Sequence, residues 1–198
     1  MVFVCSGAVA SASPIVIGFD SLADLAPVTT QFTGLTFSNA TALKAGMSLN
    51  EFEFPPHSAA DVVFDSGGPI SIDFDAPVLG VGAFFTYLVP VTLEAFDDGH
   101  NSLGIVSSSF FSNLQLSGDA GSSPNEFLEI TSSAGIRSIL ITGDPAGGSF
   151  TLDDLTVTPV PEPATFALVL AGAAAVIRKR RTGRDKRLPD DQSRLRRS

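Results

Sequence analysis

The sequence has little cysteine, few basic residues and almost no large aromatic residues other than phenylalanine. Its 198 residues include one Cys, one Tyr and no Trp beside 16 Phe. A single cysteine, Cys5, can neither form an internal disulfide nor build a zinc cage, which excludes a disulfide scaffold and a zinc finger. The hydrophobic fraction is 44% and the charged fraction is 17%, which argues against a disordered chain. The core must therefore be held by packing alone.

Basic residues are rare in most of the chain and concentrated at its end. Residues 1–177 carry two bases, Lys44 and Arg137, against 18 acids, whereas residues 178–198 carry ten bases and three acids. The formal net charge of −9 therefore combines an acidic body with a basic tail. Because an acidic surface repels phosphate backbones, we do not expect the body to bind nucleic acid.

The first twelve residues have the pattern of an export signal. An apolar stretch runs into Ala10-Ser11-Ala12, a small-residue site with cleavage expected before Ser13. No Lys or Arg precedes Lys44, so the basic start of a signal peptide is missing. We interpret residues 1–12 as a truncated signal peptide, with an N-terminal edge strand as the alternative.

Alternating patterns of period two recur between residues 13 and 159. Residues 70–75 place apolar side chains at even positions and polar ones at odd positions, as in a half-buried strand, and residues 91–95 repeat the alternation. Further candidate strands are residues 15–19, 36–37, 62–64, 81–87, 105–106, 110–116, 127–130, 138–142 and 150–157. Gly, Pro, Asn and Asp separate these segments, which predicts an all-β fold, an antiparallel β-sandwich. A helical turn is expected only near residues 41–47.

The last candidate strand changes phase. Its apolar side chains fall on even positions up to Leu152 and on odd positions from Leu155, so one extra residue must be absorbed at Asp153 and Asp154. A β-bulge is the simplest way to absorb it.

Two adjacent carboxylates in a bulge are candidate calcium ligands. Together with Asp20 after the first candidate strand, Asp153 and Asp154 would supply the oxygen ligands that calcium prefers, and Asp73 and Asp75 are further candidates. The alternative is that these residues are solvated acids at strand ends, where Asp is common.

Catalytic patterns are scarce. The only histidines are His57 and His100, and no serine lies in a G-x-S-x-G elbow. Cleavage of the signal would also remove Cys5, the only thiol. We therefore do not expect an enzyme, and a glycan-acting hydrolase stays as a third alternative. Asp73 and Asp75 have a spacing near that of glycosidase carboxylates, but any alternating acidic strand shares it.

An apolar segment lies between a proline-rich motif and a basic cluster near the C-terminus. Residues 164–177 carry no charge and would span about 21 Å as a helix, which is short of the roughly 30 Å of a bilayer core. The basic cluster that follows is typical of the cytoplasmic end of a membrane span. We predict a single transmembrane helix over residues 164–177, with a buried core helix as the alternative. The membrane-stop residues are Arg178, Lys179, Arg180 and Arg181.

The order of Pro161-Glu162-Pro163, a short apolar segment and a basic end resembles the PEP-CTERM protein-sorting domain of Gram-negative and related bacteria. The resemblance covers residues 160–181. It implies export, temporary anchoring in the bacterial membrane, and recognition of Pro161, Glu162 and Pro163 by an exosortase, a membrane-embedded transpeptidase-like enzyme. Residues 182–198 depart from the pattern, and we expect a polar, disordered tail or a frame artefact.

Residues 127–155 resemble, more loosely, the closing strands of PEP-CTERM extracellular domains that look like jelly-roll carbohydrate-binding modules. This resemblance implies a jelly-roll-like sandwich and contact with a glycan or matrix. The absence of Trp argues against an aromatic stacking platform for sugars. We expect an exported surface or matrix protein, non-enzymatic and without a cofactor, with a structural or adhesive role in an exopolysaccharide or biofilm layer. A calcium-dependent carbohydrate-binding module is the alternative.

Overall fold

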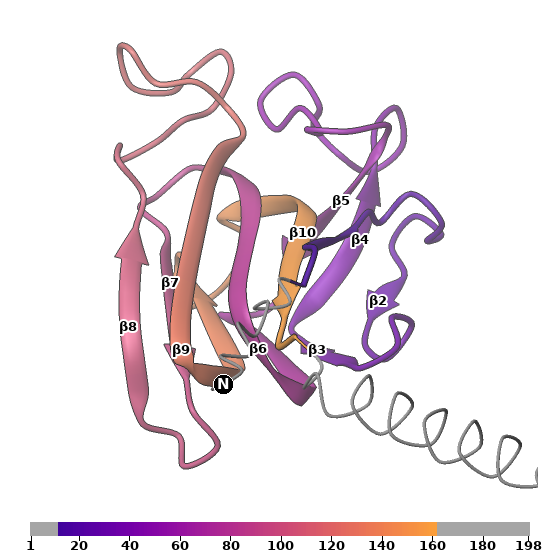
Figure 1. Ribbon diagram of the computed structural model, residues 1–198. Helices are drawn as coiled ribbons and strands as arrows, with labels where there is room; N and C mark the ends of the chain where they lie inside the picture. Colours follow the sequence, from indigo (N-terminus) through magenta and orange to yellow (C-terminus); the bar gives the residue numbers. More distant parts are fainter. Residues whose placement is uncertain (1–11, 162–198) are drawn as a thin grey trace, which may run out of the picture. The chain divides into compact units, whose positions relative to one another are not determined.

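The computed structural model describes residues 12–161, which contain ten β-strands (Figure 1). The strands are β1 (Ile15–Ile17), β2 (Pro27–Val28), β3 (Leu35–Ser38), β4 (Ala40–Lys44), β5 (Asp61–Asp65), β6 (Ile70–Tyr87), β7 (Thr92–Phe96), β8 (Ser102–Ser107), β9 (Glu126–Thr142) and β10 (Phe150–Pro159). This confirms the prediction of an all-β fold for the described residues.

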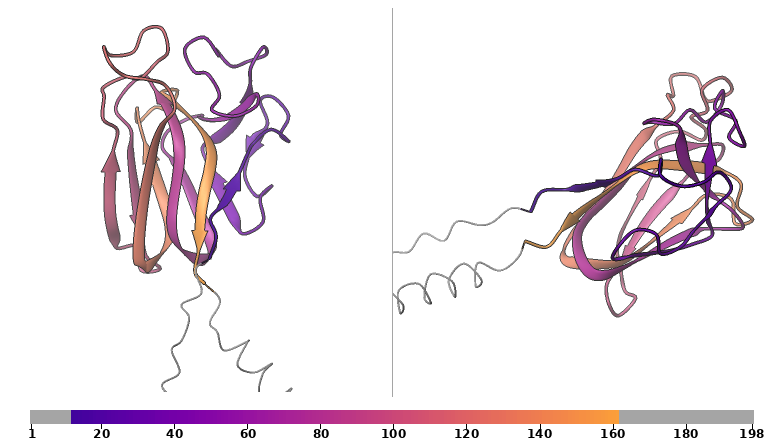
Figure 2. Two further views of the ribbon diagram at one scale, coloured as in Figure 1. Left: turned by 45° about the horizontal axis from the view of Figure 1, so that its top comes forward. Right: turned by 90° about the vertical axis from the view of Figure 1, so that its right-hand side faces the viewer.

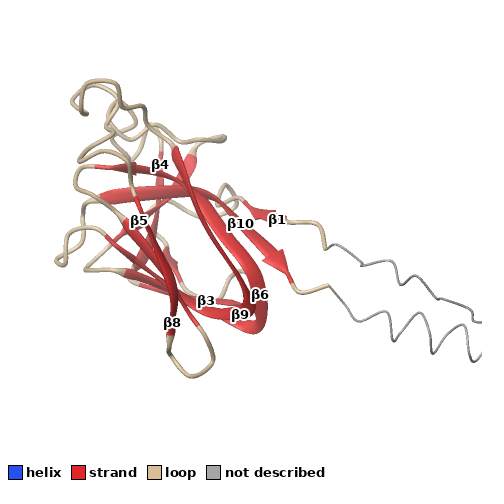
Figure 3. Cartoon of the chain, turned by 60° about the vertical axis from the view of Figure 1, so that its left-hand side comes forward, coloured by secondary structure: helices blue, strands red, loops and turns tan. Residues whose placement is uncertain are grey.

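All pairs between these strands are antiparallel, and two long strands take part in both layers of the fold. The ladder runs β2-β4-β5-β10-β6-β9-β7-β8, with β1 also beside β10 and β3 also beside β6. Strand β6 pairs with β3 through residues 71–74 and with β10 through residues 78–87, while β9 pairs with β7 only through residues 138–142. One layer therefore holds β3, β7, β8 and one half each of β6 and β9, and the other layer holds the rest (Figures 2 and 3).

The two long strands turn a corner between the layers. Pairing between β6 and β9 is interrupted between Asp73 and Val78, and Gly135 of β9 has a φ of 88° on the same corner. Strands commonly switch sheets through such bends, and a positive φ costs glycine least. The sequence predicted β6 and β9 as two strands each, because the alternation stops at the corner although the chain continues through it.

One hydrophobic core joins the two layers. It includes Ile72 and Ile139 from the first layer and Phe85 and Leu152 from the second, and each is at most 1% exposed. Residues Ala12–Val160 form one compact unit around this core. All ten strands and the core therefore lie within this unit.

The segment of residues 110–116 is a loop, so its prediction as a strand was wrong. Asn113 is fully buried in this loop, and its side-chain amide donates to Phe85 O at 2.9 Å while its Oδ1 accepts the Tyr87 N–H at 2.6 Å. The Asn113 side chain thus satisfies backbone groups at the end of β6 that a neighbouring strand would otherwise satisfy. The segment can therefore be apolar without being a strand.

Tyr87 closes the same junction from the other side. Its hydroxyl donates to the Glu126 carboxylate at the start of β9. Burial, reinforced by that carboxylate, raises the pKa of Tyr87 to about 12.

The helical turn expected near residues 41–47 is also absent from the described structure. Residues Ala40–Lys44 form β4, which pairs with β5 over its whole length. Pairing with a neighbour thus decides the conformation of a segment whose local pattern is ambiguous.

No helix long and apolar enough to span a membrane occurs within residues 12–161. The predicted transmembrane segment, residues 164–177, lies outside the described residues, as do residues 1–11 of the predicted signal peptide, the basic cluster and the tail of residues 182–198.

Candidate functional site

The predicted bulge in β10 is confirmed. Asp153 lies opposite Phe84 of β6 and Thr156 lies opposite Gly82, so β10 has two residues between these pairs where β6 has one. Asp154 takes up the extra residue with a φ of 48°. Asp tolerates this left-handed conformation better than most residues do.

The bulge holds a histidine and a serine that the sequence did not identify as partners of these acids. His57 Nδ1 lies 2.7 Å from Asp154 Oδ2, and the imidazole stacks on the ring of Phe84 with centroids 3.4 Å apart. The hydroxyl of Ser58 donates to Asp154 Oδ1 at 2.9 Å. Both oxygens of Asp154 are thus in contact with the segment that precedes β5.

Asp153 is held by backbone donors. It is 1% exposed, and its Oδ2 accepts the N–H of Ser58 at 2.8 Å while its Oδ1 accepts the N–H of Asp154 at 2.7 Å. Burial raises the pKa of Asp153, and the negative charge of Asp154 raises it further. Asp153 is therefore a buried acid of the bulge whose pKa lies above its ordinary value.

Asp20 joins the same cluster. Its Oδ1 accepts the N–H groups of Ala60 and Asp61, at 3.1 and 3.3 Å. A Cβ on Gly18 would lie 3.4 Å from Asp20 Oδ2 and 3.8 Å from Asp154 Oδ1, so the two carboxylates flank one glycine. The structure thus gathers all three predicted calcium ligands.

This gathering does not amount to a preformed cation cage in the described part of the chain. Within residues 12–161, no group of three or more His, Cys, Asp or Glu side chains is arranged to hold a metal ion. The oxygens of the cluster instead hold residues 57–61 against β1 and β10. Calcium binding at Asp20, Asp153 and Asp154 stays a prediction, and Asp73 and Asp75 lie elsewhere, on the first half of β6.

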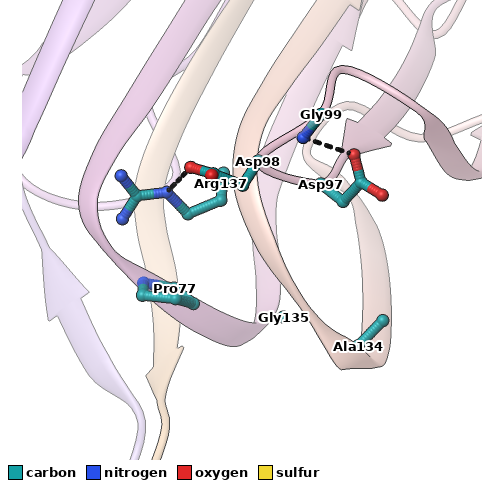
Figure 4. Close-up of a pocket in the computed structure, with 7 residues that line it drawn as sticks. All are labelled: Pro77, Asp97, Asp98, Gly99, Ala134, Gly135 and Arg137. Atoms are coloured by element: carbon teal, nitrogen blue, oxygen red, sulfur yellow. Dashed lines mark hydrogen bonds and ion pairs between the residues drawn. The ribbon is translucent and has the colours of Figure 1, made fainter.

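A polar pocket of about 470 Å³ lies at the corner of β6 and β9 (Figure 4). Arg137 is its central side chain, with Nε 3.2 Å from Asp98 Oδ1 and Nη1 donating to Asp75 O at 2.8 Å. The Asp98 side chain is 89% exposed, so this ion pair is weak. The pocket is lined by Pro77, Asp97, Asp98, Gly99, Ala134, Gly135 and Arg137. The one feature of the sequence that pointed to this pocket was Arg137, one of only two basic residues in residues 1–177.

An apolar groove of about 420 Å³ lies where β1 and β10 run out of the domain. Phe32 and Phe74 line one part of it, and Ile17, Val157 and Pro159 line another. The groove accompanies the last strand up to the residue where the sorting segment begins. Strand β10 ends at Pro159, and Pro161 is the last described residue, whereas Glu162 and Pro163 lie outside the description.

The chain carries a PEP-CTERM protein-sorting motif at residues 159–181, as the family model of that description matches there. The motif implies an exported, C-terminally sorted protein that is processed by an exosortase. No curated protein is significantly similar in sequence to the chain.

Several solved structures are similar in fold. The K2 cleaved adhesin domain of Lys-gingipain is 12% identical with a TM-score of 0.46, over 74% of this chain and 99% of that one. A mutant of CBM29-2, a family 29 carbohydrate-binding module complexed with cellulohexaose, is 10% identical with a TM-score of 0.45, over 75% and 92%. The K1 cleaved adhesin domain of Lys-gingipain from Porphyromonas gingivalis W83 is 9% identical with a TM-score of 0.43, over 75% and 99%. Similarities this distant do not carry a function to this chain.

Proposed function

We propose that the protein is a non-enzymatic surface or extracellular-matrix protein. Its β-sandwich is a structural or adhesive module in an exopolysaccharide layer, and its C-terminal segment delivers it there through an exosortase. The observation that carries the proposal is the position of the sorting motif, which begins at residue 159, the last residue of the last strand. The sorting motif thus starts where the last strand of the sandwich ends.

The contacts at the bulge hold a loop in place. The hydroxyl of Ser58 donates to Asp154 and His57 contacts the other oxygen of the same carboxylate. These contacts tie the segment before β5 to β10, which suits a structural or adhesive module.

In the proposed sorting step, Pro161, Glu162 and Pro163 are recognised, the segment of residues 164–177 anchors the chain in the membrane, and the basic cluster that starts at Arg178 retains the cytoplasmic end. Glu162 supplies the only charge between Asp154 and that cluster. Its carboxylate is therefore the most specific contact that the motif can offer an enzyme.

The test is to express the full chain and its Glu162→Ala variant in a host that contains an exosortase and to measure the mass of the mature protein. We expect the wild type to lose its C-terminal segment and the variant to keep it. Glu129→Ala, which changes an exposed glutamate on β9, is the matched control and should be processed like the wild type. Equal processing of the wild type and the Glu162 variant would contradict the recognition step.

A second candidate function is calcium-dependent carbohydrate binding. The observation that favours it is the gathering of Asp20, Asp153 and Asp154 at the bulge. A ligand that binds the folded state raises its melting temperature, so millimolar calcium added to a fragment of residues 13–160 should raise Tm if the site is real. Asp20→Asn should remove that rise. An unchanged Tm would eliminate this candidate.

A further inference from the structure

We propose that β8 is a self-association strand, through which two copies of the domain join edge to edge into one continuous sheet. Strand β8 ends the ladder of strands, and among residues 12–161 it pairs with β7 alone. Its other edge lies on the outside of the domain (Figure 1). An unpaired edge offers a row of N–H and C=O groups to an added strand.

The two ends of the ladder differ in how they are protected. The opposite end, β2, is two residues long and begins with Pro27, and both features prevent strand addition. Strand β8 has six residues, Ser102–Ser107, with no charge and no proline. Its Ile105 is 58% exposed, and an exposed large apolar side chain on an edge strand favours pairing with another strand. The protection found at β2 is therefore missing at β8.

The direction of the free backbone groups follows from one hydrogen bond. The N–H of Ser108 donates to Val91 O at 2.9 Å, so the backbone of residue 108 points toward β7. Backbone groups alternate in direction along an antiparallel strand. Ser107 and Ile105 therefore direct their N–H and C=O groups toward the free edge, and Val106 directs its own toward β7.

A shift in the pairing with β7 limits how much of β8 can be used. Ala95 lies opposite Gly104 and Phe96 lies opposite Ser102, so β8 has one extra residue at Leu103, and Gly104 has a φ of 149°. The regular stretch is therefore residues 104–107. Within it, an antiparallel partner can form the full set of hydrogen bonds when Ile105 faces Ser107 of the partner copy.

That register places Val106 opposite Val106 of the other copy, on a twofold axis. Because the backbone groups of Val106 point to β7, this is a pair without mutual hydrogen bonds, whose Cα atoms lie about 4.5 Å apart. Val106 already packs against the core, so the pair would extend the apolar interior across the junction. The same patch on both copies meets itself, as in most homodimers.

The charge of the domain favours this edge over other surfaces for contact between copies. Residues 13–160 hold 17 acids and two bases, so two copies repel each other wherever their acids face. The uncharged β8 edge avoids direct charge contact. We therefore take the partner of β8 to be the β8 of a second copy, because that edge is equally uncharged and has the same length.

Cysteine cross-linking tests the register on the fragment of residues 13–160, which contains no cysteine. A disulfide bridges Cα atoms about 4.4 to 6.8 Å apart, so Val106→Cys should form a covalent dimer under mild oxidation. Ala134→Cys, at an exposed position on the corner of β9, is the control for random collision. We expect cross-linking of the first variant to be at least about tenfold faster than that of the second.

Sedimentation of the same fragment tests the association without a cross-link. The molecular mass should rise with concentration toward that of a dimer. Ser107→Pro removes an N–H that points away from β7, so it should raise the dimer dissociation constant at least about tenfold. At dilutions where both proteins are monomeric, its Tm should equal that of the wild type. Ser107→Ala keeps the N–H and should dimerise like the wild type.

A fragment that stays monomeric, equal cross-linking of the two cysteine variants, or a Ser107→Pro variant that still dimerises would each overturn the β8 proposal. These results do not depend on export, because the fragment lacks the sorting motif. Failure of the sorting test would leave strand pairing intact.

Discussion

At the scale of single residues, the bulge in β10 buries one carboxyl group beside another and uses both to hold a loop. Asp153 is buried beside Asp154, and both are engaged by residues 57–61. Because the pKa of Asp153 is higher in the folded protein than in the unfolded chain, the folded state holds that proton more tightly. This contribution to the free energy of unfolding is present at low pH and is lost as pH rises through the folded pKa.

We predict that Asp154→Asn lowers the pKa of Asp153 without returning it to its ordinary value. The substitution removes the neighbouring charge but leaves burial, which is the larger cause of the shift. Asn also tolerates the φ of 48° at this position, so the bulge should be kept. Carbon NMR titration of the carboxyl groups measures the change. A pKa that stays where it is in the wild type would mean that the two carboxylates do not interact.

The bulge itself could be predicted from the sequence, but its partners could not. The change of phase between Leu152 and Leu155 is a local signal that needs no knowledge of the fold. His57 contacts Asp154 across 97 positions of the chain, and a lone histidine in a proline-rich loop carries no pattern that points to a distant partner. Asp20 and Asp154 flank Gly18, and calcium binding by Asp20, Asp153 and Asp154 stays a prediction.

At the scale of elements, the corner of β6 and β9 determines how two layers arise from so few long strands. Gly135 has a φ of 88°, and a Cβ there would lie 3.1 Å from Pro77 Cβ. Both the backbone conformation and the close approach thus require glycine. Gly121 offers a matched comparison, because its φ is 86° and a Cβ there would have no neighbour within 4 Å.

We therefore predict that Gly121→Ala lowers the free energy of unfolding by about 1 kcal/mol, the cost of a left-handed conformation in a residue with a Cβ. Gly135→Ala should lower it by about 2 kcal/mol or more, since it adds the contact with Pro77. Urea unfolding measures both values. Equal losses would show that the corner can relax around the added methyl group.

The sequence predicted strands well where the local alternation and the pairing with neighbours agree. It predicted them poorly where a contact with a distant residue decides the conformation. Residues 110–116 look like a strand by composition, but the buried Asn113 ends β6 and keeps the segment in a loop. Residues 40–44 form β4 because β5 lies beside them. Alternation reveals which side chains face the core, and it does not reveal which strand continues through a corner.

At the scale of the whole molecule, charge dominates the folded domain, with 17 acids against two bases in residues 13–160. Lys44 and Arg137, the two bases, each contact one acid. Most carboxylates are therefore uncompensated, and their mutual repulsion opposes folding.

We predict that Tm of the fragment of residues 13–160 rises when potassium chloride is increased from about 0.01 M to about 0.15 M, because the screening length falls from about 30 Å to about 8 Å. Glu129→Lys removes one exposed acid and adds a base, so the rise should be smaller in this variant. Thermal melts followed by circular dichroism give both slopes. A fall in Tm with salt would mean that the two ion pairs outweigh the repulsion.

The junction at the end of β6 also gives the protein a built-in optical probe. The chain has no tryptophan, and Tyr87 is its only tyrosine, so its near-ultraviolet signal comes chiefly from this one buried phenol. Its hydroxyl donates to Glu126, and its backbone N–H donates to Asn113 in the loop of residues 110–116. Alkaline titration followed by absorbance therefore reads the state of a single place: a phenol that ionises near its ordinary pKa marks a detached loop, and one that resists until about 12 marks a loop in place.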